Sequence, residues 1–147
     1  MSNTLMPPAA RRAVGRFVAI ALAAVATGLG GVIGRLAHIG YIIATPFGTR
    51  EITLLVAVAG TAAAGLVGWF ALAILQRYTA HPRRTWIALA IVVFGVSIFP
   101  VFATPAALAT QLMLTAQHCV AAAVLIPGLL RTSDDPWPAP RTQAYQP

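Results

Sequence analysis

Four long runs without a charged residue constrain this chain more than any other feature of its sequence. A bilayer core about 30 Å thick needs about 20 apolar residues in a helix, and each run is close to that length. Only 9% of the residues are charged, against about a quarter in soluble domains. The sequence therefore predicts an all-α fold, a polytopic membrane protein with a four-transmembrane-helix bundle over residues 17–131, with spans at about 17–34, 52–75, 85–102 and 106–130.

The segments outside the bundle are expected to lack a fixed fold. Residues 1–16 read as a basic, disordered N-terminal tail, and residues 132–147 as a Pro-rich disordered C-terminal tail. The small-residue pattern ending at Ala26 allows a second interpretation, in which the first span is a cleaved signal peptide. The apolar run continues for eight further residues after Ala26 and reaches span length, which favours a retained span.

The positions of the arginines predict the orientation of the spans. All ten basic residues are arginine, and eight of them lie before the first span, between the second and third, or after the fourth. The other two connections hold only Arg35 and Arg50. Short cytoplasmic loops collect Lys and Arg, so both termini should be cytoplasmic in a multi-pass protein of the cell (plasma) membrane. Arginines spread beside apolar runs, rather than over one soluble face, do not indicate binding of nucleic acid.

Few residues of this chain could carry catalysis or bind a metal. Cys119 is the only cysteine, and the only acids are Glu51, Asp134 and Asp135, all outside the spans. His118 and Cys119 are adjacent and point about 100° apart on a helix, so they cannot share one ion. Paired carboxylates, a nucleophile with its base and a glycine-rich phosphate loop are all missing from the sequence. We expect no enzymatic activity, no cofactor and no metal.

The last span carries a candidate intramembrane polar site on one stripe of the helix, formed by Gln111, Thr115 and His118. Polar groups in lipid must be satisfied within protein, so this stripe should face the bundle interior or a partner subunit. Thr110 and Gln117 lie about 100° away on a neighbouring face. His118 either fixes the packing of the span or titrates to relay a proton. The first role is favoured because no span contains an acid.

The connection between the first two spans holds a candidate extracytoplasmic cluster of Arg35, His38 and Glu51. An ion pair between Arg35 and Glu51 would close this connection. The alternative is that each residue is an interfacial anchor with no binding role. The middle of the connection is apolar, so part of it should lie in the membrane interface or fold against the bundle.

The end of the chain carries a resemblance to a known family. Its last span reads QHCVAAAVLIPGLLR, with a histidine near mid-span and Pro-Gly-Leu near its exit, and a basic flank precedes the first span. In these features the chain resembles a family of small four-span integral membrane proteins of unknown function from high-GC, actinobacterial-type bacteria. The resemblance implies the same four-helix fold and no activity.

These observations favour a non-enzymatic structural or accessory membrane component. Small residues at four-residue spacing, such as Gly60, Ala64 and Gly68, let helix backbones approach closely in lipid. The expected partners are the lipid bilayer and either a second copy of the chain or another membrane protein. The alternative function is that of a small transporter, or of a protein that binds a lipid or small molecule through the polar stripe of the last span.

Overall fold

The structure is a computed structural model that describes residues 7–45 and 48–133. Over these residues, four helices are each long and apolar enough to cross a membrane. The predicted all-α four-helix fold is confirmed, with one small β-hairpin in the first connection. The elements in chain order are α1 (Pro8–Leu36), β1 (Ile42–Thr45), β2 (Gly48–Glu51), α2 (Leu54–Tyr78), α3 (Pro82–Ala103) and α4 (Leu108–Leu130).

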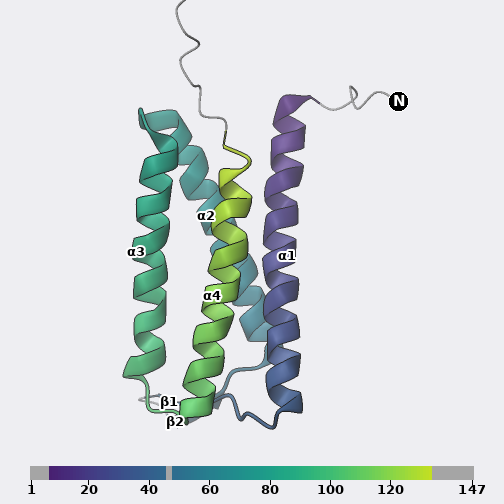
Figure 1. Ribbon diagram of the computed structural model, residues 1–147, viewed down its shortest axis with the longest axis vertical. Coiled ribbons are helices and arrows are strands. Elements are labelled where there is room, and N and C mark those ends of the chain that lie inside the picture. The colour runs from purple at the N-terminus through teal and green to yellow at the C-terminus, as the bar shows by residue number, and fades with distance from the viewer. Residues whose placement is uncertain (1–6, 46–47, 134–147) are drawn as a thin grey trace, which may run out of the picture.

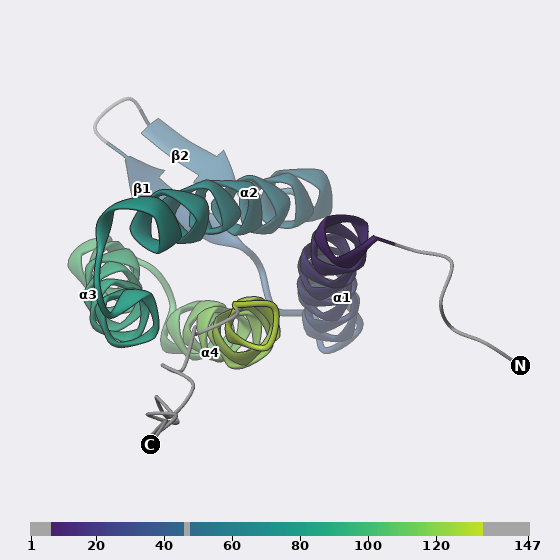
Figure 2. The same cartoon turned by 90° about the horizontal axis from the view of Figure 1, so that it is seen from above.

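Helices α1, α3 and α4 run roughly along the long axis of the molecule, and α2 crosses behind α4 at an angle (Figure 1 and Figure 2). The connections lie at alternate ends. The start of α1, the α2–α3 loop and the end of α4 lie at one end, and the hairpin and the α3–α4 connection lie at the other (Figure 1). Seen from above, α4 lies between α1 and α3, and α2 lies across the bundle from α4 (Figure 2). This alternation is what four successive membrane spans require.

Helix α1 begins earlier than the sequence predicted. Residues 8–16, which we assigned to a disordered tail, form its first turns, with a proline at the first helical position. Proline suits that position because its missing N–H would have no helical partner there. The prediction was wrong because it placed the start of the helix at the edge of the apolar run, whereas a helix can continue beyond the bilayer. Residues 1–6 and 134–147, the rest of the two predicted tails, lie outside the described residues.

The first connection folds into an antiparallel hairpin that the sequence did not predict. Strand β1 pairs with β2 so that Ile42 lies opposite Glu51 and Ala44 opposite Thr49. The Ala44 N–H also donates to the carbonyl of Pro105, 3.3 Å away, which attaches the hairpin to the α3–α4 connection. Strands of four residues are too short for a clear alternating pattern, so a sequence reading cannot separate them from a loop.

Small residues allow α1 to lie close to α2 and α4. A Cβ atom at Gly65 would lie 2.8 Å from the side chain of Ile20, and one at Gly128 would lie 2.7 Å from that of Ala19. The predicted stripe on α2 is only partly such a face. Gly68 packs against the Trp86 ring, but nothing lies within 4 Å of a Cβ at Gly60.

The most enclosed apolar cluster lies where α2 ends, α3 begins and α4 ends. It consists of Leu72, Trp86, Ala90 and Leu129. The buried residues of α3 are Pro82, Trp86 and Ala90, all in its first half. Helix α3 is therefore attached to the bundle mainly at this end.

Candidate functional site

The predicted polar stripe of α4 is not the face that α4 buries. Gln111, Thr115 and His118 are half-buried. Their side chains bond to nearby backbone: the Gln111 amide to the Thr104 carbonyl (3.4 Å), the Thr115 hydroxyl to the Gln111 carbonyl (2.8 Å), and Nδ1 of His118 to the Leu114 carbonyl (2.8 Å). These bonds suit a packing role for His118. A functional role for the stripe stays a prediction.

The buried polar side chains of α4 are Thr110 and Gln117, on the neighbouring face. The Thr110 hydroxyl donates to the carbonyl of Gly40 over 2.6 Å. The Gln117 amide donates to the hydroxyl oxygen of Tyr41 over 3.3 Å. Gln111, Thr115 and His118, which we expect to face the bundle interior or a partner subunit, are therefore less buried than Thr110 and Gln117, because α4 is turned so that this other polar pair receives the first connection. Contact of the stripe with a partner subunit stays a prediction.

The predicted extracytoplasmic cluster is brought together only in part. A guanidinium nitrogen of Arg35 lies 3.6 Å from a carboxylate oxygen of Glu51, with side chains 47% and 64% exposed. This is the ion pair that the sequence suggested. His38 is exposed with φ 55°, in the turn after α1. Among the described residues, no hydrogen bond or ion pair joins its ring to Arg35 or Glu51.

Tyr41 is the residue that fixes the first connection against the bundle. It is only 6% exposed, its carbonyl accepts from the Ile52 N–H (2.8 Å), and its hydroxyl accepts from Gln117. A Cβ at Gly34 would overlap the Tyr41 hydroxyl and lie 2.8 Å from Cζ of the ring. The expectation that part of this connection folds against the bundle is confirmed, and Tyr41 makes this contact together with the hydrogen bond from Thr110 to Gly40.

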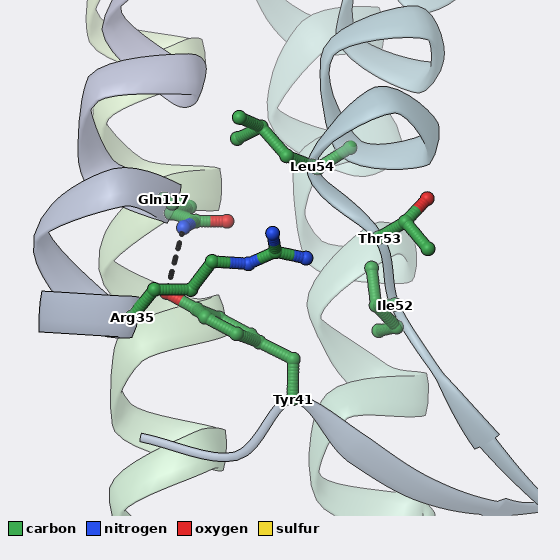
Figure 3. A pocket seen from close by; sticks show the side chains of 8 residues that line it. Arg35, Tyr41, Ile52, Thr53, Leu54 and Gln117 are labelled. Atoms are coloured by element: carbon green, nitrogen blue, oxygen red, sulfur yellow. Dashed lines mark hydrogen bonds between the residues drawn. The ribbon is translucent and has the colours of Figure 1, made fainter. Parts of the chain in front are cut away.

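A small pocket lies between α1, α2 and Tyr41 at the hairpin end of the bundle. Its empty space is about 220 Å³ including the open mouth, and its enclosed part has room for about one water-sized group. Figure 3 shows the Arg35 side chain reaching across this space between Gln117 and the start of α2. The pocket is lined by Gly31, Arg35, Tyr41, Ile52, Thr53, Leu54, Ala57 and Gln117.

Burial raises the pKa of Tyr41 above its ordinary value of about 10. The hydrogen bond from Gln117 and the charge of Arg35 act in the opposite direction, and burial outweighs both. The phenol therefore keeps its proton to a higher pH in the folded state than in the unfolded state.

The free energy of unfolding should consequently fall as the pH rises above about 10. Between the two pKa values the unfolded chain binds fewer protons than the folded chain, so alkali favours unfolding. The contribution of Tyr41 is complete below about pH 10 and is lost as the pH rises through the folded pKa. Unfolding measured in detergent from pH 8 to 11 should show this slope, and Tyr41→Phe should flatten it. An equal slope in both proteins would contradict the assignment.

A second polar cluster, at the opposite end of the bundle, was missed by the sequence reading. Arg16 is only 7% exposed. Its Nε donates to the Thr132 hydroxyl (3.1 Å), a terminal nitrogen donates to the Gln76 carbonyl oxygen (2.9 Å), and its guanidinium lies 6.0 Å from the centroid of the Trp69 ring. One arginine of α1 thus joins α2 to the residues just after α4. The sequence alone indicates only a topology signal at Arg16.

A helical pattern could have revealed this role. Arg16 lies on the same face of α1 as the buried Ala19, Ala23 and Thr27. On that face Thr27 accepts a hydrogen bond from the Thr61 hydroxyl of α2 at 3.1 Å. A basic residue that continues a stripe of small residues is directed at the neighbouring helices.

No metal site is visible in residues 7–45 and 48–133, where no three His, Cys, Asp or Glu side chains lie together. The lone Cys119 is exposed. The polar side chains described above bond to one another or to backbone carbonyls.

Four apolar helices of spanning length, joined at alternate ends, define the class as a multi-pass membrane protein. The chain belongs to the family described as "Family of unknown function (DUF6069)", whose model matches residues 7–135. Comparisons with curated proteins and with solved structures give no match. The expected relationship to a family of unknown function is confirmed, and it brings no activity with it.

Proposed function

We propose that this protein is a non-enzymatic structural or accessory component of a bacterial plasma membrane, whose helices bind a partner membrane protein or a second copy. The observation that supports this most is how little of its apolar surface the chain covers itself. In the most apolar 18-residue stretch of α3, only 6% of the residues are buried. In the corresponding stretches of α2 and α4, 11% of the residues are buried. Such faces are open to lipid and to other helices.

The interior of the bundle supports the same conclusion. Its polar side chains are engaged in holding elements together: Thr61 with Thr27, Gln117 with Tyr41, and Arg16 with Gln76. The transporter alternative has less support, because the side chains of the Gln111–His118 stripe bond to backbone carbonyls of α4 and of the α3–α4 connection.

A photo-crosslinking residue at Val96 tests the proposal. Val96 is 67% exposed on the half of α3 that lies away from its attachment to the bundle. In cells, we expect irradiation to give one discrete protein adduct, either a dimer of the chain or a complex of fixed mass. A matched probe at Leu22, 57% exposed on α1, reports contacts of a different helix. Adducts only to lipid from both positions would contradict a role in assembly.

The proposed orientation places both termini in the cytoplasm. Figure 1 shows the start of α1, the α2–α3 loop and the end of α4 at one end of the bundle. The arginines of these segments are Arg11, Arg12, Arg16, Arg77, Arg83, Arg84 and Arg131, and the described residues of the opposite end hold Arg35 and Arg50. This asymmetry supports a positive-inside arrangement.

Reporter fusions should show this orientation directly. Fusions after Ala80 and after Pro147 are expected to be active as cytoplasmic reporters, and a fusion after Gly48 as an extracytoplasmic one. An extracytoplasmic signal at Ala80 or Pro147 would overturn the orientation. Retention of the first span is supported separately by packing, since cleavage at Ala26 would remove the buried Arg16, Ile20 and Ala23 from the bundle.

A further inference from the structure

We propose that the pocket between α1, α2 and Tyr41 binds the headgroup of a phospholipid from the leaflet at the hairpin end. In this arrangement Arg35 binds the phosphate, and the Gln117 amide oxygen accepts a hydrogen bond from the tip of the headgroup. This inference does not depend on whether the protein has a protein partner.

The position of the pocket suits a lipid. It lies where α1 ends at Leu36 and α2 begins at Leu54, which is the level of the headgroups if these helices span the bilayer. Beside the pocket, Leu55 and Val56 of α2 are 77% and 61% exposed. A ligand that is polar at one end and apolar along the rest matches this combination.

The polar groups of the pocket are of two kinds. Arg35 is permanently charged and has five N–H donors. Its contact with Glu51 joins one guanidinium nitrogen to one carboxylate oxygen, so most of these donors do not face Glu51. Gln117 is only 8% exposed, and its nitrogen donates to Tyr41. Its oxygen points away from Tyr41, toward the side where the Arg35 guanidinium lies (Figure 3). The pocket thus offers the Arg35 cation and, from the mostly buried Gln117 side chain, a hydrogen-bond acceptor.

The size of the pocket favours a lipid over a free solute. Its enclosed part holds about one water-sized group, so only the tip of a ligand can enter. A Cβ at Gly31 would lie 2.6 Å from Cδ1 of Leu54, which shows how closely the two helices approach at the pocket. A free anion would therefore rest on Arg35 alone, whereas a lipid is held nearby by its acyl chains and is always at high local concentration.

The acceptor inside the pocket predicts a preference among headgroups. Glycerol and ethanolamine headgroups end in hydrogen-bond donors, and choline does not. The pocket should therefore favour phosphatidylglycerol and phosphatidylethanolamine over phosphatidylcholine.

Native mass spectrometry of the full chain in detergent, titrated with phosphatidylglycerol or phosphatidylcholine, tests this proposal. We expect phosphatidylglycerol to bind about fivefold more tightly, and Arg35→Gln to weaken it by about fivefold, as loss of one arginine near a headgroup should. The matched control is Arg50→Gln, at the same end on the exposed strand β2 and outside the pocket, which should leave binding unchanged. Gln117→Met should abolish the corresponding preference for phosphatidylethanolamine over phosphatidylcholine, two lipids of equal net charge.

Glu51→Gln distinguishes a lipid site from a purely structural ion pair. The Glu51 side chain is exposed, so its replacement should not affect folding. It should strengthen binding of phosphatidylglycerol, because it removes the carboxylate that competes for Arg35. Equal binding of both lipids, equal effects of Arg35→Gln and Arg50→Gln, or weaker binding in Glu51→Gln would overturn the proposal. Displacement of the lipid by inorganic phosphate would also overturn it, by assigning the site to a free anion.

Discussion

Replacing Arg16 with methionine is expected to lower the free energy of unfolding by about 3 kcal/mol, since hydrogen bonds to a charged group contribute about 1.5–3 kcal/mol each. The Arg16 guanidinium is buried and donates to Gln76 of α2 and to Thr132 after α4. Methionine keeps an unbranched apolar stem in place of that of arginine, so the loss reports mainly the hydrogen bonds and the charge. The measurement is unfolding in detergent by a denaturant, followed by circular dichroism.

Two further variants make this result specific. Arg16→Lys keeps the charge but has no planar fork to reach both acceptors, so it should lose about half as much stability. Arg83→Met removes an exposed arginine from the same end of the bundle and should change stability by no more than about 0.5 kcal/mol. If Arg16→Met and Arg83→Met had equal effects, Arg16 would be only one more charge at that end of the bundle.

The four helices could be predicted because lipid imposes their length. In the bilayer every backbone N–H and C=O must be bonded within the protein, so an apolar run of about 20 residues has only one common structure. That rule ends at the membrane surface, and the errors lie there. Residues 8–16 are helical, and residues 42–45 pair with residues 48–51 as two strands, in segments where water and local contacts decide the structure.

The rotation of α4 could not be read from its own residues. Its sequence offers two polar faces, one with Thr110 and Gln117 and the other with Gln111, Thr115 and His118. Which face is buried depends on α1, where a Cβ at Gly30 would already lie 3.4 Å from Cγ of Gln117. It depends also on Tyr41, 76 residues away in the chain from Gln117. A single sequence shows the glycines and the glutamine but not their pairing.

The ion pair between Arg35 and Glu51 could be predicted because it does not depend on how the helices pack against one another. Glu51 is the only acid before Asp134, and Arg35 is one of only two arginines in the connection that Glu51 closes. Arg16 shows the opposite case. Its place beside an apolar run fits a topology signal, and only the neighbouring helices reveal that it is buried.

Gly34→Ala should destabilise the protein by about 2 kcal/mol, within the range for overpacking of a filled site. A Cβ at this position would overlap the Tyr41 hydroxyl and lie 2.8 Å and 3.2 Å from Cζ and Cε2 of the ring. The ring must therefore leave its site, and its hydrogen bond with Gln117 is lost. A change from glycine to alanine inside a helix usually stabilises the helix by about 1 kcal/mol, so the destabilisation expected here has the opposite sign.

A double-mutant cycle with Tyr41→Ala decides whether Tyr41 is the cause. Once the ring is absent, Gly34→Ala meets no obstacle and should become neutral or stabilising, so that the sign of its effect reverses between the two backgrounds. Gly60→Ala is the matched control, since nothing lies within 4 Å of a Cβ there, and it should not destabilise either protein. An equal loss from Gly34→Ala with and without the tyrosine would mean that residue 34 is glycine for another reason, such as the approach of helix α1 to a neighbouring helix. A reversal would establish that the glycine-rich end of α1 is shaped to receive the first connection, and that Tyr41 holds this connection against the bundle.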